Sequence, residues 1–156
     1  MPRRQRITHR VIAPDPVYQN EALAKFVNCV MLKGKRSVAE TIVYGAFEKI
    51  RRSQRREPLE VFEAAMRNVT PILEVKPKRV GGATYQVPVE IRHDRRLALA
   101  RRWIIRYARS RHGRSMSDKL AAELMDASNG MGQSVKRKED THKMAESNKA
   151  FSHFRY

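Results

Sequence analysis

The sequence predicts a mainly α fold: a six-helix domain with one protruding β-hairpin. Three observations lead to this prediction. Apolar residues recur at helical spacing in six segments, polar and apolar residues alternate convincingly in one stretch only, and 156 residues suffice for one domain with a core. We therefore expect a single domain over residues 1–156, with a basic N-terminal arm at 1–16, a hairpin arm at 73–92 and a C-terminal helix and tail at 134–156.

The first sixteen residues are basic and interrupted by prolines. Arg3, Arg4, Arg6 and Arg10 carry most of their charge. Such a segment cannot bury enough apolar surface to fold alone. It is either a frayed tail or a nucleic-acid arm, and the basic character of the rest of the chain favours the arm.

Three helices are expected between this arm and the hairpin. The first spans about 20–31, the second spans about 38–52, and the third begins near Pro58 and ends before Pro71; each carries one apolar stripe. Cys29 lies beside the first stripe, and we expect it to be a small, inert neighbour of the core.

The loop between the first two helices is basic, with Lys33, Lys35 and Arg36 close together. Gly34 is predicted to end the first helix and Ser37 to cap the second. A nucleotide-binding loop is disfavoured, because this Gly-Lys-x-Ser sequence lacks the earlier glycine and the preceding strand that the motif requires. The three cations are nevertheless well placed to contact phosphates.

The stretch 73–92 has the period of a β-hairpin. Polar and apolar residues alternate on both sides of Gly81-Gly82, and a glycine pair supplies the positive φ angles of a tight turn. Pro77 and Pro88 each remove a ladder donor, so neither strand is expected inside a wide sheet. Two strands alone are marginally stable in water, and the hairpin therefore needs a surface from its own helices or from a partner. Cations along its first strand make an anionic partner the expected one; they are Lys76, Lys78 and Arg79.

Three further helices follow the hairpin. The fourth, about 94–110, is rich in arginine and has only Asp94 as an acidic partner, which favours RNA backbone contact over a solvated basic face. Trp103 lies among these arginines and is predicted to pack on the core. The fifth opens with a capping signature at Ser115 and ends at Asn129-Gly130. The sixth, about 134–151, has a thin apolar stripe, so its end and the aromatic tail are expected to need a partner surface.

Charge points to a polyanionic partner. Lys and Arg number 33 against 16 Asp and Glu, a net charge of +17, which costs self-repulsion that a polyanion relieves. Nucleic acid is the first candidate and an anionic membrane surface the second. No apolar run approaches the ~18 residues of a membrane span, and the basic helices lack exposed Trp or Phe stripes.

The sequence does not predict an enzyme or a metal site. The five histidines lie on different predicted elements without ligand spacing, and the carboxylates are scattered or paired along helices. Cys29 is the only cysteine, which excludes a disulfide framework and a zinc cluster of cysteines and fits a reducing, intracellular setting. No cofactor and no metal are expected.

Several motifs together resemble one family. The hairpin stretch Lys76-Pro-Lys-Arg-Val-Gly-Gly-Ala-Thr-Tyr-Gln-Val-Pro-Val-Glu90 is similar to the hairpin signature of the family of small-subunit ribosomal protein seven, in its bacterial or organellar form. The similarity extends over the whole chain. Further matching segments are Phe26-Val-Asn, Lys33-Gly-Lys-Arg-Ser, Ile42-Val-Tyr-Gly-Ala46, Arg96-Leu-Ala-Leu-Ala100, Arg102-Trp-Ile104 and Lys138-Glu-Asp-Thr-His-Lys-Met-Ala-Glu146.

This resemblance implies a structural constituent of the small ribosomal subunit, cytoplasmic or in an organellar ribosome. It implies early binding to the 3′ major domain of the small-subunit rRNA, nucleation of head assembly and a place near the tRNA exit site. The implied partners are small-subunit ribosomal proteins nine, eleven and nineteen, exit-site tRNA and nearby mRNA. The implied tRNA-proximal residues are Arg79, Val80, Gly81 and Gly82.

The residues expected to bind RNA are Arg3, Arg4, Arg6, Arg10, Lys33, Lys35, Arg36, Lys76, Lys78, Arg79, Arg92, Arg95, Arg96 and Arg102. Repression of its own mRNA is an additional role that some members of the family have. The alternative from another class is a DNA-binding helical regulator. That function needs Asn or Gln at the exposed start of a recognition helix, where the fourth helix has arginines.

Overall fold

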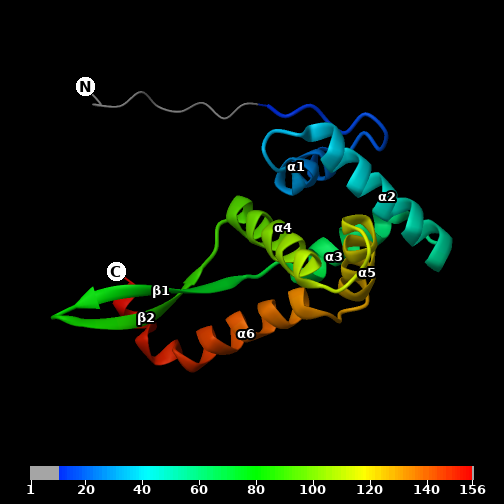
Figure 1. Ribbon diagram of the computed structural model, residues 1–156. Coiled ribbons are helices and arrows are strands. Elements are labelled where there is room, and N and C mark those ends of the chain that lie inside the picture. The colour runs from blue at the N-terminus through cyan, green and yellow to red at the C-terminus, as the bar shows by residue number, and fades with distance from the viewer. Residues whose placement is uncertain (1–10, 156) are drawn as a thin grey trace, which may run out of the picture.

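A computed structural model describes residues 11–155 and shows a mainly α protein with one β-hairpin, as the sequence predicts (Figure 1). In chain order the elements are α1 Glu21–Val30, α2 Arg36–Gln54, α3 Pro58–Val69, β1 Leu73–Val80, β2 Ala83–Glu90, α4 His93–Ser110, α5 Met116–Ser128, α6 Gln133–Ser147 and the 3₁₀ segment η1 Lys149–Arg155. Among the described residues, no helix combines the length and apolar character that crossing a bilayer requires.

Helices α1 to α5 form the body around one apolar core. Phe26, Phe47 and Phe62 are fully buried there. The Phe26 and Phe62 rings meet edge to face, with centroids 5.1 Å apart, an arrangement favoured beyond simple burial. Gly45 lets α2 approach α5 closely, because a Cβ at this position would lie 3.1 Å from the Ser117 hydroxyl.

The hairpin leaves the body as an antiparallel pair with a two-residue turn. Val80 faces Ala83 across that turn, and the turn residues have φ of 56° at Gly81 and 91° at Gly82. This confirms the predicted hairpin. The two strands form a two-stranded sheet, so the ribbon stands outside any larger sheet.

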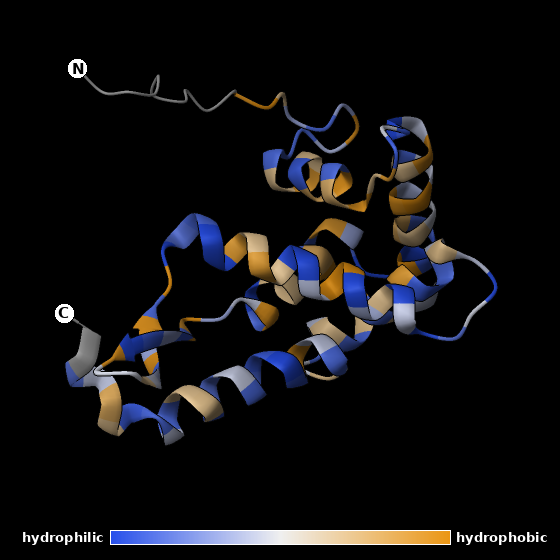
Figure 2. Ribbon diagram, turned by 60° about the vertical axis from the view of Figure 1, so that its left-hand side comes forward, coloured by the Kyte–Doolittle hydropathy of each residue, from blue (hydrophilic) through white to orange (hydrophobic). Residues whose placement is uncertain are grey.

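The surface on which the ribbon lies comes from the chain's own C-terminal part. Figure 1 shows α6 running beside the hairpin, with η1 folded back toward it. The backbone N–H of Ile72 donates to Nε2 of His142 at 3.0 Å, and the ring of Phe151 lies 5.4 Å from that of Tyr85. Hairpin and α6 therefore form one arm, although polar residues dominate α6 (Figure 2).

One prediction about the C-terminal segment is wrong, and a second is corrected for one residue. The sixth helix was expected to reach Phe151 but ends at Ser147, because the Asn148 side chain donates to the carbonyl of Met144 at 2.8 Å and closes the last turn. The aromatic tail was expected to need a partner surface, but Phe151 packs on Tyr85 of the hairpin; the side chains of Phe154 and Tyr156 lie outside the described residues.

The helix caps follow the predictions in part. Ser115 and Asp118 form the predicted capping box on α5, and hydrogen bonds from Lys49 and then Ser115 lower the pKa of Asp118 to about 2. Ser37 is not the cap of α2, because that helix already begins at Arg36, which pairs with Glu40 one turn on at 2.8 Å.

Gly34 was expected to end the first helix, but it does not cap α1. It lies in the following loop with φ of 74°, and Met31 is the C-cap.

The body begins inside the stretch expected to be an N-terminal arm. Asp15 is 1% exposed and accepts hydrogen bonds from the backbone of Val17 and Tyr18 and, at 2.7 Å, from the hydroxyl of Tyr44. Burial and then this hydrogen bond raise the pKa of Tyr44. Asp15 thus anchors the chain to α2.

Candidate nucleic-acid interface

The basic loop between α1 and α2 is exposed together with the first residues of α2, from Leu32 to Val38. Lys33 has a left-handed backbone with φ of 53°, which makes the tight turn that precedes Gly34. Lys33 and Lys35 form no ion pair with other described residues, whereas Arg36 is held by Glu40. The two lysines are thus available for an external anion.

The C-terminal half of α4 carries a row of arginines that lies next to this loop. Arg102, Arg106 and Arg109 recur at helical spacing around a shallow hollow that also includes Ile105 and Ser110. Nη2 of Arg109 donates to the carbonyl of Val30 at 3.2 Å, where α1 ends and the loop begins. We call this surface, with the loop lysines Lys33 and Lys35, the α1–α4 basic surface.

Two residues of the α1–α4 basic surface are absent from the set of RNA-binding residues predicted from the sequence. Arg106 and Arg109 were not among the predicted RNA-binding residues, although their spacing from Arg102 along one helix was a signal that could have identified them. Cys29 was expected beside the core, but its side chain is exposed in the same hollow. It lies on the side of α1 that faces the arginines of α4, whereas Phe26 and Val27 lie on the side that faces the core.

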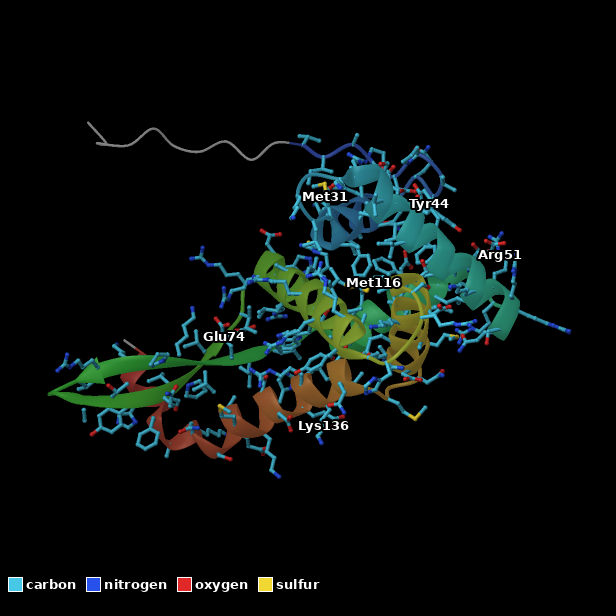
Figure 3. All side chains as sticks on the ribbon, viewed as in Figure 1. Met31, Tyr44, Arg51, Glu74, Met116 and Lys136 are labelled. Atoms are coloured by element: carbon cyan, nitrogen blue, oxygen red, sulfur yellow. The ribbon has the colours of Figure 1, made fainter. Side chains whose placement is uncertain are left out.

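A second group of predicted cations lies at the root of the hairpin. Arg95 donates to Glu74 on β1, and Arg96 donates to Glu90 on β2 at 2.8 Å and to the carbonyl of Ile91 at 2.6 Å. Arg92, at the start of α4, is exposed beside them. Figure 3 shows Glu74 where the hairpin leaves the body, below the start of α4.

These ion pairs correct one step of the sequence argument. The arginines of α4 were expected to lack acidic partners, since only Asp94 was found at helical spacing. The hairpin supplies the partners instead, from positions that helical spacing cannot reveal. Burial alone would raise the pKa of the Glu74 carboxyl, but hydrogen bonds from Arg95 and Lys76, together with their charges, hold it below its usual value.

The hairpin itself presents further cations toward its tip. Lys76 and Arg79 are exposed, and Lys78 is half-buried. Lys76 lies 3.3 Å from Glu74, so its charge is partly compensated. At the tip, a Cβ added to Gly81 or Gly82 would meet open space, which leaves the backbone accessible to a large partner.

Trp103 packs against the core, as predicted. The guanidinium group of Arg137 on α6 lies over its ring, 6.0 Å from the ring centroid, in a cation–π contact. The tryptophan therefore joins α4 to α6 and is not free to stack on a base. Within residues 11–155, no cluster of three or more His, Cys, Asp or Glu side chains could hold a metal ion.

The structure thus brings several of the predicted cations into two groups. Loop and α4 residues form the α1–α4 basic surface, and Lys76 lies with Arg92, Arg95 and Arg96 at the hairpin root, whereas Lys78 and Arg79 lie farther along the hairpin. Arg3, Arg4, Arg6 and Arg10 lie outside the described residues.

Comparison with known proteins finds relatives that are similar over the full length of the chain. Residues 2–149 match the family described as "Ribosomal protein S7p/S5e". Proteins called "Small ribosomal subunit protein uS7" are 62% identical in Pelotomaculum thermopropionicum and 60% identical in both Thermoanaerobacter pseudethanolicus and Carboxydothermus hydrogenoformans. Each similarity covers 156 residues, which is 100% of this chain and 100% of the relative.

Proposed function

Since this chain belongs to the Ribosomal protein S7p/S5e family, we propose that it binds the 3′ major domain of the small-subunit rRNA and nucleates assembly of the subunit head. Its coarser role follows from the family: it is a structural, non-enzymatic constituent of the small ribosomal subunit in the cytoplasm. The finer role includes a place near the tRNA exit site and the mRNA, with small-subunit proteins nine, eleven and nineteen as neighbours.

The observation that carries rRNA binding is the α1–α4 basic surface. Arg102, Arg106 and Arg109 line a hollow without any carboxylate, and Arg109 donates to the carbonyl of Val30, where the loop that carries Lys33 and Lys35 begins. A row of arginines along one helix can bind the RNA backbone, because a guanidinium group forms bidentate hydrogen bonds to phosphate oxygens. The same surface offers no pattern of Asn or Gln side chains for reading base edges, so the structure favours backbone contact over the DNA-regulator alternative.

The hairpin supports the second part of the proposal. Strands of eight residues reach about 25 Å at ~3.3 Å per residue, and Glu74 and Glu90 fix their root to α4. A rigid arm with an exposed glycine tip can approach a bulky RNA such as exit-site tRNA. Arg79, Val80, Gly81 and Gly82 are the residues that we assign to this contact.

Binding of the chain to its own mRNA would use the same cations. An mRNA that presents phosphates in the geometry of the rRNA site would compete for the α1–α4 basic surface. We therefore include translational repression as an additional role, testable by competition between the two RNAs for one site.

The test of rRNA binding is its dependence on salt. We expect the affinity for an RNA containing the 3′ major domain to fall by ~10³–10⁵ between ~50 and ~200 mM salt, if about 6–10 phosphates are contacted. Arg102→Gln with Arg106→Gln should weaken binding and reduce the salt slope by about two. Arg55→Gln with Arg56→Gln removes the same charge at the far end of α2 and serves as the control. A salt-independent affinity, or equal losses in both double variants, would contradict the proposed interface.

A further inference from the structure

A small apolar pocket lies where the chain passes from α1 to α2 (Met31 in Figure 3). It has a volume of about 220 Å³. This is below the ~300 Å³ at which sites for drug-sized ligands begin, so the pocket suits one compact apolar or planar group. We call it the α1–α2 pocket; its apolar lining consists of Val30, Met31, Leu32, Val38, Ala39 and Ile42.

The α1–α2 pocket is preformed. Val30 and Ala39 are buried at its floor, whereas Leu32 and Val38 are 63% and 52% exposed at its rim. The backbone N–H of Lys35 donates to the carbonyl of Leu32 at 3.1 Å and closes the turn between the two helices. Two large aliphatic side chains are thus presented to solvent from a fixed backbone, so that a ligand can bind without reorganising the loop.

The charges at the pocket select an anionic ligand. Lys33 and Lys35 line it together with the apolar side chains, and no carboxylate is part of this lining. Neither lysine forms an ion pair within residues 11–155, and Glu40 on α2 is already paired with Arg36 at 2.8 Å. An apolar group flanked by negative charge therefore fits the pocket best. A nucleotide within an RNA strand has this composition, because its base lies between two phosphates.

The α1–α2 pocket is continuous with the α1–α4 basic surface. Cys29, in the hollow of arginines, and Val30, in the pocket, are consecutive residues at the end of α1. Nη2 of Arg109 donates to the carbonyl of Val30 at 3.2 Å, so the row of arginines begins beside the pocket. An RNA strand that is bound along those arginines therefore comes within reach of the pocket.

The apolar character of the pocket favours an unpaired base over a paired one. An A-form duplex displays phosphates and 2′-hydroxyl groups, and proteins recognise RNA bases mainly where these are unpaired and can be splayed out. The face of such a base can pack on aliphatic side chains while its polar edge stays at the rim, where it remains hydrogen-bonded. The lining has no Asn, Gln, Ser or Thr side chain, so the pocket distinguishes unpaired from paired bases without selecting their identity.

We propose that the α1–α2 pocket binds one unpaired base of the rRNA, packed between Leu32 and Val38, while Lys33 and Lys35 bind the phosphates on either side of it. Contacts to phosphates are independent of sequence and allow a protein to slide along a strand. The pocket supplies the fixed point that sets where the strand lies on the α1–α4 basic surface. This inference rests on the proposed binding of rRNA and adds the recognition of an unpaired nucleotide.

The salt dependence of binding separates the pocket from the arginines. Leu32→Ser with Val38→Ser should weaken binding of the full chain to RNA containing the 3′ major domain by roughly tenfold at every salt concentration. The salt slope should stay unchanged, because no charge is removed. Met131→Ser with Met144→Ser is the matched control: these side chains are 59% and 50% exposed, in the loop before α6 and on α6, and the variant should bind like the natural chain.

Two results of this measurement would overturn the pocket as a base site. One is an affinity that the substitutions at Leu32 and Val38 leave unchanged, or that falls equally in the methionine control. The other is a loss of affinity accompanied by a smaller salt slope, because the substitutions would then act by displacing the lysines and not by removing an apolar contact.

Removal of single bases from the RNA identifies the occupant. RNA that has lost one base per molecule at random positions is mixed with the chain, and the bound and free molecules are separated and mapped. For the natural chain, loss of the base at one unpaired position should reduce binding about tenfold. For Leu32→Ser with Val38→Ser the same loss should have no further effect, because the contact is already absent. An identical map for both chains, or a map without any unpaired position, would contradict the proposal.

A protein occupant and a failure of the rRNA interface give different results. If Leu32→Ser with Val38→Ser reduces entry into reconstituted small subunits but not binding to the isolated RNA, a protein segment fills the pocket and the base assignment is wrong. If Arg102→Gln with Arg106→Gln leaves the affinity and the salt slope unchanged, the rRNA interface itself fails. If that variant behaves as proposed while the pocket variant binds like the natural chain, only the base pocket is wrong.

Discussion

Arg95 on α4 forms a two-point ion pair with Glu74 on β1, through the Nε and Nη2 edge of the Arg95 guanidinium group. Its Nε lies 3.0 Å from each carboxylate oxygen, and its Nη2 lies 2.9 Å from Oε2. The side chain of Glu74 is 12% exposed and that of Arg95 is 50% exposed. This pair therefore fixes the root of the hairpin to the helix while leaving part of the guanidinium group open to solvent.

Replacing Glu74 by alanine is expected to lower the free energy of unfolding by about 1 kcal/mol, which is less than the ~1.5–3 kcal/mol typical of a hydrogen bond to a charged group, because the exposed Arg95 can be hydrated instead. This corresponds to a fall of about 2–4 °C in melting temperature. The depressed pKa of Glu74 means that its contribution is present above about pH 4.3 and is lost as the pH falls through the folded-state value.

Thermal melting of Glu74→Ala and the natural chain at about pH 7 and about pH 3 measures this effect, and the difference should shrink at the acid pH. Glu57→Ala is the control, since Glu57 pairs with Arg51 at 3.5 Å with both side chains exposed. A control loss as large as that of Glu74→Ala would show that the hairpin root has no special role.

Protonation of His142 is expected to loosen the contact between α6 and the start of β1. Burial, and then the charge of Lys138, lower the pKa of His142, and its Nε2 accepts from the N–H of Ile72. The unfolded chain therefore binds the proton more readily, so this stabilisation is complete above about pH 6.5 and declines as the pH falls.

The measurement is the hydrogen-exchange protection of the Ile72 amide at about pH 7.5 and about pH 5, corrected for the intrinsic exchange rate. Protection should fall severalfold at the lower pH in the natural chain. His142→Phe should show low protection at both values and no change between them. Equal protection of the natural chain at both values would mean that His142 does not control this junction.

Removing the carboxylate of Glu123 is expected to destabilise the body. Glu123 is fully buried; its Oε2 accepts from Nε of Arg111 at 2.6 Å, and its Oε1 accepts from the N–H of Ser134 at 3.1 Å. Glu123→Ala leaves Arg111 with Asp126 as its remaining acidic partner and leaves the buried N–H of Ser134 without its acceptor, so it should cost about 3 kcal/mol. That loss lowers the melting temperature by about 6–12 °C.

Denaturant unfolding of Glu123→Ala and Glu123→Gln checks this prediction. The amide oxygen of glutamine can still accept from Ser134 but no longer neutralises Arg111, so the loss should be intermediate. Because Ser134 lies in the first turn of α6, both variants should also increase hydrogen exchange in α6. A cost below about 1 kcal/mol for Glu123→Ala would show that solvent replaces the carboxylate.

Shortening the hairpin is expected to affect tRNA handling rather than stability. Replacing residues 79–84 by Gly-Gly removes two cross-strand pairs and leaves Lys78 opposite Tyr85 as the last pair before the turn, so the register is preserved. The removed tip has no buried side chain, and the contact between Tyr85 and Phe151 remains. The melting temperature and entry into subunits should therefore be nearly unchanged.

Subunits with the shortened hairpin should differ in retention of exit-site tRNA or in reading-frame maintenance. Arg79→Ala should show part of the same effect, since Arg79 is the exposed cation nearest the tip. If the shortened chain fails to enter subunits, while those subunits that do form handle tRNA normally, the arm serves assembly instead of tRNA.

Local sequence patterns were sufficient for the elements and for the kind of partner. The apolar stripes identified the helices, Gly81-Gly82 identified the hairpin turn, and Ser115 identified the start of α5, because each signal depends on residues within about one turn of its neighbours. The excess of Lys and Arg pointed to a polyanion, since no fold requires it.

Contacts between residues distant in the chain were decided only by the tertiary structure. The pairing of Arg95 with Glu74, the packing of Phe151 on Tyr85 and the exposure of Cys29 beside Arg102 each depend on how one element lies against another. Helical or strand spacing cannot reveal them, because it describes which face a residue occupies but not what that face meets. The sequence by itself therefore determined that this chain is a basic helical domain with an arm, and the packing of its elements decided which cations remain free to bind RNA.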